Sequence, residues 1–253
     1  MLTIENLTVT RGQRQILELS QASLAAGDFI AVLGPNGAGK SSLLKVLCGE
    51  WSASRGSIQL HKKSITDWPR QLLARHLGVL PQASQLSFPF KALEVVAIGA
   101  TPLSLTRQAT ADAIKRWMQA TDTWQFADRL YTSLSGGEKQ RVQLARVLLQ
   151  LSQADDEPLL LLDEPTSAQD LGQQHQLLQL IKALCDQYSF AVISILHDLN
   201  HASRYADSVW LLHQGQLYAQ GSPQQVLQPA TVMNIWGYQP ERLVNSHGQQ
   251  ILV

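Results

Sequence analysis

The spacing of apolar residues divides most of the chain into short strands that alternate with helices. Residues 2–10 alternate apolar and polar side chains, as a half-buried strand does, and 15–24 is predicted as a second strand. The wholly apolar run at 159–162 is typical of a buried strand in a parallel sheet. Further strands are predicted at 29–33, 56–60, 76–81, 190–196 and 207–213, and helices at 171–187 and 199–205.

The stretch from about residue 84 to 150 interrupts this alternation. It begins irregularly and then shows helical periodicity at 91–99, 107–120 and 138–150, so we expect a mostly helical insert. The tail at 216–253 shows Gly-Ser-Pro punctuation and weak helical patterns. The pattern therefore predicts one α/β domain over 1–253, in which 1–83 and 151–253 form the core and about 84–150 a helical subdomain.

Composition narrows the class of protein. The 253 residues, 45% of them hydrophobic, are ample for a sizeable core. A net charge of zero and a pI of about 7.1 give no basic footprint for nucleic acid. Cys48 and Cys185 lie in apolar helical patterns and are predicted to be free thiols. Neither a secretory signal nor an apolar run of roughly 18–20 residues is visible, so we expect a cytosolic protein that reaches a membrane only through a partner.

The candidate chemistry begins with the letters GPNGAGKSS at 34–42, between the strand at 29–33 and an apolar helical run at 43–47. Glycines at this spacing let backbone N–H groups point at phosphate oxygens, and the following helix adds its positive end. Lys40 would reach the β- and γ-phosphates, and the Ser41 hydroxyl would ligate Mg²⁺. A glycine-rich turn with a stray lysine would not match all four fixed positions of this motif. The predicted nucleoside triphosphate site comprises Gly34, Pro35, Asn36, Gly37, Ala38, Gly39, Lys40, Ser41 and Ser42.

Two carboxylates follow the strand at 159–162, where ligands of open α/β sheets gather. Asp163 is predicted to hold Mg²⁺, through water, opposite Ser41. Glu164 is the predicted general base that deprotonates the attacking water. His197 ends the strand at 190–196 and would contact the γ-phosphate from the same sheet edge. Taken alone, the acidic pair would be a helix-capping turn and the histidine a loop residue; the phosphate loop in the same chain favours the catalytic interpretation.

The string LSGGE at 134–138 carries a second anion-binding signal. Ser135 and Glu138 have the spacing of a capping box that opens the helix at 138–150. A capping box does not explain the two glycines between them, which cost stability at a helix start. Glycines are useful there if the backbone must approach an anion closely. The predicted anion-contacting residues are Leu134, Ser135, Gly136, Gly137 and Glu138.

Taken together and in this order, the motifs resemble those of the nucleotide-binding subunits of ABC transporters, and the resemblance runs essentially end to end. It implies a P-loop NTPase (RecA-like) core with an N-terminal antiparallel β subdomain and an inserted α-helical subdomain. It also implies an ATPase that uses ATP and Mg²⁺. In such a homodimer each ATP lies between the phosphate loop of one subunit and residues 134–138 of the other.

The resemblance assigns further residues. Gln82 matches the Q-loop glutamine, a Mg²⁺ ligand that carries opening and closing to a membrane permease docked beside the region after it. The D-loop is matched by Ser167, Ala168, Gln169 and Asp170. This chain departs from the family at two of its positions. Arg11 stands where an aromatic residue usually stacks on adenine, although a guanidinium plane also stacks on a base. Gln169 stands where leucine is usual.

Several strings are similar to the importer branch for iron chelates, heme and cobalamin, among them LHDLN at 196–200 and SFPF at 87–90. A polar insertion at 150–158 is typical of the hemin-import group. The resemblance implies two transmembrane permease subunits, a periplasmic heme-binding protein acting indirectly, and a peripheral location on the cytoplasmic face of the inner membrane. The alternatives are a ferric-siderophore or cobalamin importer and a soluble ABC ATPase of DNA repair or translation. The modest insert and the neutral charge disfavour the soluble ATPase, and Glu164 disfavours a regulator that only binds nucleotide.

Overall fold

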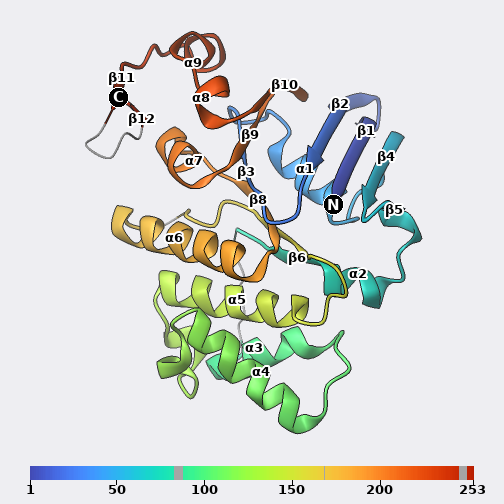
Figure 1. Ribbon diagram of the computed structural model, residues 1–253, viewed down its shortest axis with the longest axis vertical. Coiled ribbons are helices and arrows are strands. Elements are labelled where there is room, and N and C mark those ends of the chain that lie inside the picture. Colours follow the sequence, from blue (N-terminus) through green and yellow to red (C-terminus); the bar gives the residue numbers. More distant parts are fainter. Residues whose placement is uncertain (83–87, 168, 245–249) are drawn as a thin grey trace. The chain divides into compact units, whose positions relative to one another are not determined.

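The computed structural model describes residues 1–82, 88–167, 169–244 and 250–253. They form two compact units, one made of 1–67 with 191–253 and the other of 68–190, whose elements are labelled in Figure 1. The predicted start of the helical insert near residue 84 lies outside the described residues. The subdomain limits drawn from the sequence therefore stay a prediction.

The first unit contains a mixed sheet whose strands follow the order β5-β4-β1-β2-β10-β9-β3-β8. Its N-terminal part is antiparallel: β1 pairs with β2 and β4, and β4 pairs with β5. In the other part β3 lies between β8 and β9 and is parallel to both. The bounds are β1 (Leu2–Arg11), β2 (Arg14–Leu24), β3 (Phe29–Leu33), β4 (Arg55–Leu60), β5 (Lys63–Ser64), β8 (Ala191–Ile195) and β9 (Ser208–His213). The predicted strands of this unit are confirmed to within two residues at each end.

The strand β10 (Gln216–Gly221) joins the two parts of this sheet, and the prediction of weak helices is wrong there. β10 is antiparallel to β9 and touches β2 in parallel at Gln216 and Glu18. Gln214 and Gly215, with φ of 50° and 80°, form the two-residue turn before it. Positive φ at both central residues is typical of a type I′ hairpin turn. The Gln-Gly pair was the local signal for this strand.

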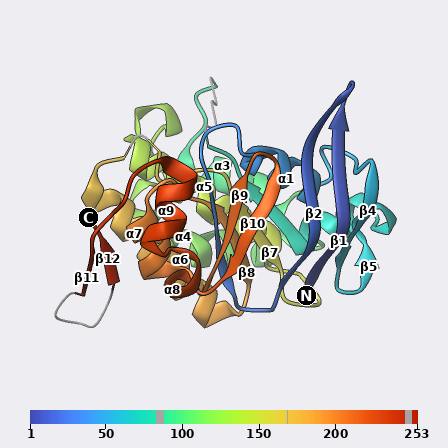
Figure 2. The same cartoon turned by 90° about the horizontal axis from the view of Figure 1, so that it is seen from above.

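The helices of the first unit are short. α1 begins directly after the phosphate loop and buries Leu43, Leu44, Val46 and Leu47. Two helices in the tail confirm that part of the prediction, and a small antiparallel hairpin follows them (Figure 2). The bounds are α1 (Lys40–Leu47), a 3₁₀ turn at Ile65–Asp67, α7 (Leu199–Tyr205), α8 (Pro223–Val226), α9 (Pro229–Trp236), β11 (Arg242–Val244) and β12 (Gln250–Leu252).

The second unit packs helices around a parallel strand pair, β6 (Leu77–Leu80) and β7 (Leu159–Leu162). The central helix of this unit is α5, which packs against α2, α3, α4 and β6. The predicted helices and the buried strand at 159–162 are confirmed. The bounds are α2 (Arg70–His76), α3 (Ala92–Ala97), α4 (Arg107–Ala120), α5 (Gly136–Leu151) and α6 (Leu171–Tyr188), with 3₁₀ turns at Ile98–Ala100, Trp124–Phe126 and Tyr131–Ser133.

One boundary in this unit differs from the prediction. His76 was expected to begin a strand, but it ends α2, and the strand starts at Leu77. The ring of His76 packs 4.8 Å from that of Trp68, and its Nδ1 lies 3.0 Å from the Leu72 carbonyl oxygen. These contacts hold the residue in the last helical turn. Within the described residues, no helix combines the length and the apolar content that crossing a membrane requires.

Candidate functional site

The loop between β3 and α1 has a backbone that only glycine can adopt at two positions. Gly34 has φ of 146°, and a Cβ there would lie 2.1 Å from the Leu212 carbonyl oxygen. Gly39 has φ of 102°, and its Cβ would lie 3.1 Å from Leu17 Cδ1. At these two positions the loop is therefore pressed against β9 and β2 without room for a side chain. This is the tight turn that a phosphate-binding loop needs.

Lys40 is the first residue of α1 and is 94% buried by its own loop. Its Nζ donates hydrogen bonds of 2.7 Å to the Gly34 carbonyl oxygen and 3.0 Å to that of Pro35. The ammonium group is thereby held inside the curve of the loop. Ser41 follows it on the first helical turn and is exposed. A fixed cation, a hydroxyl and a positive helix end suit a phosphate with its Mg²⁺.

Arg11 ends β1 in the same unit, and its guanidinium carbon lies 4.0 Å from the centroid of the Trp51 ring. Lys45 Nζ lies 5.0 Å from the same ring. Sequence reasoning assigned Trp51 no role, and its place after α1 gave no signal for one. The indole holds the guanidinium plane by a cation–π contact. The stacking of Arg11 on adenine stays a prediction.

In the second unit, two predicted catalytic residues meet at the ends of β6 and β7. Gln82 Nε2 donates a hydrogen bond of 2.6 Å to Glu164 Oε2. The Asp163 N–H donates 3.0 Å to the Leu80 carbonyl oxygen, which extends the ladder between the two strands by one residue. Glu164 has φ of 48°, in the left-handed region. Such backbone strain in a residue other than glycine is found most often at functional sites.

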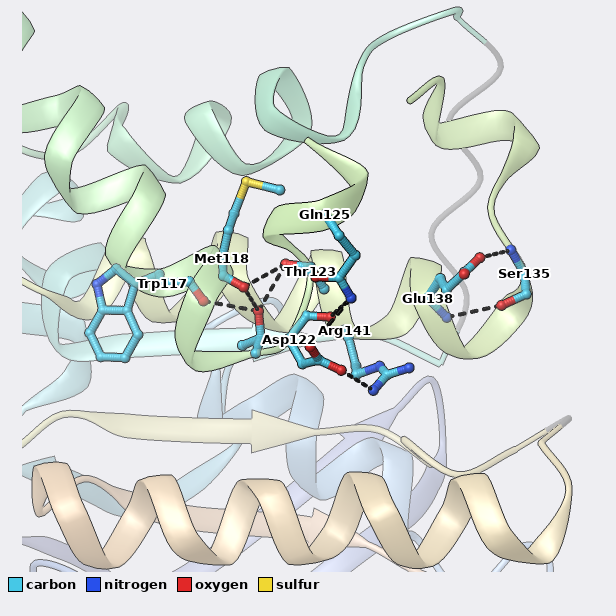
Figure 3. Close-up of polar contacts among 9 residues, drawn as sticks. Trp117, Met118, Asp122, Thr123, Gln125, Ser135, Glu138 and Arg141 are labelled. Carbon is cyan, nitrogen blue, oxygen red and sulfur yellow. Dashed lines mark hydrogen bonds and ion pairs between the residues drawn. The ribbon is translucent and has the colours of Figure 1, made fainter. Parts of the chain in front are cut away.

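The turn before α5 is a capping box (Figure 3). Ser135 Oγ accepts from the Glu138 N–H over 3.3 Å, and the Ser135 N–H donates to Glu138 Oε2 over 2.7 Å. That backbone N–H lowers the pKa of the Glu138 carboxyl. A Cβ on Gly136 would meet nothing within 4 Å, whereas one on Gly137 would lie 2.8 Å from Gln173 Oε1. The exposed helix start at Gly136 thus has open space beside its backbone.

Two anchors hold this turn in place. Leu134 is buried just before it. Arg141, one turn further along α5, donates from a guanidinium nitrogen to Asp122 Oδ2 over 3.4 Å (Figure 3). Asp122 sits in the turn that ends α4, where the Thr123 hydroxyl donates to the Met118 carbonyl oxygen over 3.1 Å. The turn before α5 is therefore braced by the end of α4.

The predicted D-loop leads into α6. Asp170 caps that helix, since its Oδ1 accepts from the Gln173 N–H over 2.8 Å. The Gln169 carbonyl oxygen accepts from Gln174 Nε2 over 2.9 Å, and Gln169 Oε1 is buried without a hydrogen-bond partner among the described residues. Ser167 N–H donates to the Glu164 carbonyl oxygen over 3.1 Å. Ala168 lies outside the described residues.

His197 belongs to the first unit and follows β8 in an exposed position. The structure thus brings Gln82 and Glu164 together in one unit, and it builds the lysine-containing loop in the other. The predicted joint action of Asp163 and Glu164 with Lys40, Ser41 and His197 stays a prediction, as does Mg²⁺ ligation by Ser41, Gln82 and Asp163.

Comparison with known proteins gives a consistent result. A family model described as "ABC transporter" matches residues 17–167. The hemin import ATP-binding protein HmuV of Vibrio cholerae is 49% identical over 242 residues, which are 96% of this chain and 92% of that protein. The protein of the same name from Shewanella denitrificans is 48% identical over 94% of each chain.

Solved structures agree with these relatives. One, described as a metal-chelate type ABC transporter in an inward-facing conformation, superposes with a TM-score of 0.83 and 26% identity, over 100% of this chain and 96% of that one. Another, cbiO1 of Clostridium perfringens, part of the ABC transporter complex cbiONQ, gives 0.81 and 27% over 92% of each chain.

Proposed function

The chain belongs to the ABC transporter family, and from this premise we propose that it is the ATP-hydrolysing motor subunit of a hemin importer. The assignment of hemin as the cargo rests on one observation. The sequence is 46–49% identical to hemin import ATP-binding proteins from several species over at least 92% of this chain. The phosphate loop supports binding of the triphosphate, and the Gln82–Glu164 pair supports its hydrolysis.

The loop at 34–42 holds the triphosphate in this proposal, with Lys40 neutralising phosphate charge from its buried position. Ser41, Gln82 and Asp163 would hold Mg²⁺, which neutralises charge on the β- and γ-phosphates when bound. Glu164 accepts the proton of the attacking water. The hydrogen bond from Gln82 orients the Glu164 carboxylate to accept this proton, and it links Glu164 to the end of the strand β6.

The exposed start of α5 supports assembly as a homodimer. Each subunit would lend residues 134–138 to the ATP held by the phosphate loop of its partner. The capping box uses the Ser135 and Glu138 side chains to fix this turn, and Gly136 leaves its backbone accessible. A helix N-terminus without side chains in the way is well suited to approach the γ-phosphate of a second subunit.

An apolar patch after Gln82 supports docking of a membrane permease. Phe88 is 69% exposed, and Phe90 and Leu130 beside it are also exposed. The patch is rigidly built, because the Tyr131 N–H donates to the Phe90 carbonyl oxygen over 2.8 Å and Lys91 bridges to Leu130. Exposed apolar clusters of this kind mark interaction sites. In the homodimer, each copy would offer this patch to one of two permease subunits, with a periplasmic heme-binding protein beyond them. This subunit would then lie peripherally on the cytoplasmic face of the inner membrane.

Reconstitution tests the cargo. The chain and a candidate permease partner are placed in liposomes, and ATP-dependent uptake of hemin, a ferric siderophore and cobalamin is compared. We expect hemin to move with wild-type protein and not with the Glu164→Gln variant. Uptake of the siderophore or cobalamin in place of hemin would contradict the proposed cargo and leave the ATPase assignment intact. ATP hydrolysis that no permease affects would favour a non-transport ATPase.

A further inference from the structure

The side chain of Asn200, three residues after His197, binds the backbone of Leu252 at both of its polar groups. Asn200 Nδ2 donates to the Leu252 carbonyl oxygen over 3.0 Å, and the Leu252 N–H donates to Asn200 Oδ1 over 2.8 Å. Both bonds are partly buried, and they join residues 52 positions apart in the sequence. A paired amide contact of this kind imitates a neighbouring strand.

The register of the hairpin explains why Leu252 is free to make these bonds. Glu241 and Val253 exchange both of their backbone hydrogen bonds, at 2.8 and 3.0 Å, and Leu252 lies opposite Arg242. In an antiparallel pair the polar groups of the adjacent residue point away from the partner strand. The N–H and C=O of Leu252 therefore face α7, where the Asn200 amide satisfies both. In both views α7 and β12 lie side by side (Figures 1 and 2).

The same short segment determines where His197 stands. Before it, the Leu196 N–H donates to the Val32 carbonyl oxygen over 3.2 Å, which ties the end of β8 to β3. After it, Asp198 caps α7 by accepting from the N–H groups of Asn200 and His201 over 2.7 and 3.1 Å. Asn200 thus bonds Asp198 through its backbone and Leu252 through its side chain.

We propose that Asn200 is a positioning residue for His197, and that residues 250–253 are part of the support through which it acts. This inference rests on the proposed contact of His197 with the γ-phosphate. Without the Asn200 amide, two partly buried backbone groups of Leu252 lose their partners, which is costly. The hairpin then separates from the first turn of α7, and the turn that carries Asp198 and His197 gains freedom. The phosphate loop and its hydrogen bonds to Lys40 are not part of this chain of contacts.

The test compares Asn200→Ala with Asn234→Ala, a matched control that removes an exposed asparagine from α9 of the same unit. For Asn200→Ala we expect faster hydrogen exchange at the Leu252 amide, and a kcat for ATP about five- to tenfold lower, on the scale of one lost hydrogen bond, with KM nearly unchanged. Asn200→Asp keeps the acceptor for the Leu252 N–H. We expect its kcat and its Leu252 exchange rate to lie between those of wild type and Asn200→Ala. If Asn200→Ala folds poorly, this second variant provides the comparison.

A double-mutant cycle with His197→Ala, followed by single-turnover hydrolysis, separates positioning from general destabilisation. We expect Asn200→Ala to cause no further loss in the His197→Ala background. Equal losses in both backgrounds, or faster Leu252 exchange with unchanged kcat, would overturn the positioning role. Unchanged Leu252 exchange would overturn the anchor itself. If His197→Ala alone hydrolyses ATP normally, the proposed role of His197 fails and positioning fails with it, while Leu252 exchange still reports whether the anchor exists.

Discussion

Gln82 and Glu164 are joined side chain to side chain by a hydrogen bond of 2.6 Å, although 82 positions separate them in the sequence. They follow two parallel strands that pair residue by residue, from Leu77 with Leu159 to Leu80 with Leu162. The residue proposed to deprotonate water is therefore oriented by Gln82, and a displacement of Gln82 would change the position of the Glu164 carboxylate directly.

The carboxylate of Glu164 is testable as a general base. Glu164→Gln keeps the size of the side chain and removes the basic oxygen, so we expect hydrolysis to slow by roughly 10²–10⁴ with ATP affinity retained. Steady-state turnover and equilibrium ATP binding measure the two quantities. The control is Glu241→Gln, which changes an exposed glutamate of the first unit. Normal turnover by Glu164→Gln would remove Glu164 from the mechanism.

The coupling role of Gln82 predicts a difference between two assays. In Gln82→Ala the Glu164 carboxylate loses its amide partner, and the link to the segment after β6 is cut. We expect the ATPase of the assembled transporter during transport to fall more than the basal ATPase of the isolated subunit. Both rates are measured on the same preparation. An equal loss in the two assays would show that Gln82 serves hydrolysis alone.

Gly34 predicts a local stability effect. In Gly34→Ala the added methyl would overlap the Leu212 carbonyl oxygen, 2.1 Å away, at a φ that L-residues rarely adopt. We expect the free energy of unfolding to fall by at least about 2 kcal/mol. Gly12→Ala is the control, because its φ of 62° is also positive but nothing lies within 4 Å of the added Cβ. The control should cost about 1–2 kcal/mol. Denaturant unfolding compares them, and equal costs would contradict the proposed overlap.

The capping box predicts a dependence on pH. The Ser135 N–H lowers the pKa of Glu138 below its ordinary value of 4.5, so the ionised carboxylate stabilises the folded state. For a lowered folded pKa, this stabilisation is present above the unfolded pKa and is lost as the pH falls through the folded one. Glu138→Gln removes the charge at every pH. We expect wild type to be the more stable at pH 7, and the difference to shrink below the ordinary pKa and vanish once the pH has fallen through the lowered folded pKa. A difference that does not change with pH would mean that the charge contributes nothing.

Local patterns in the sequence determined the elements and the chemistry of the phosphate loop. The strand at 159–162 and the helices at 107–120 and 199–205 match the structure residue for residue, because apolar periodicity and capping residues act over a few neighbours. The glycines, Lys40 and Ser41 stand in one contiguous loop, so their spacing alone indicated how that loop would be used.

Only the tertiary structure decided which distant segments meet. It placed β10 between β2 and β9, set Trp51 beneath Arg11, and brought the Gln82 amide to Glu164. It also gave the Asn200 amide to Leu252. Apart from the hairpin of β9 with β10, whose turn has a local signal, none of these contacts has a local signature, since each joins residues tens of positions apart. The identity of the proposed reacting groups can be read from the sequence, whereas their orientation depends on the folded sheet.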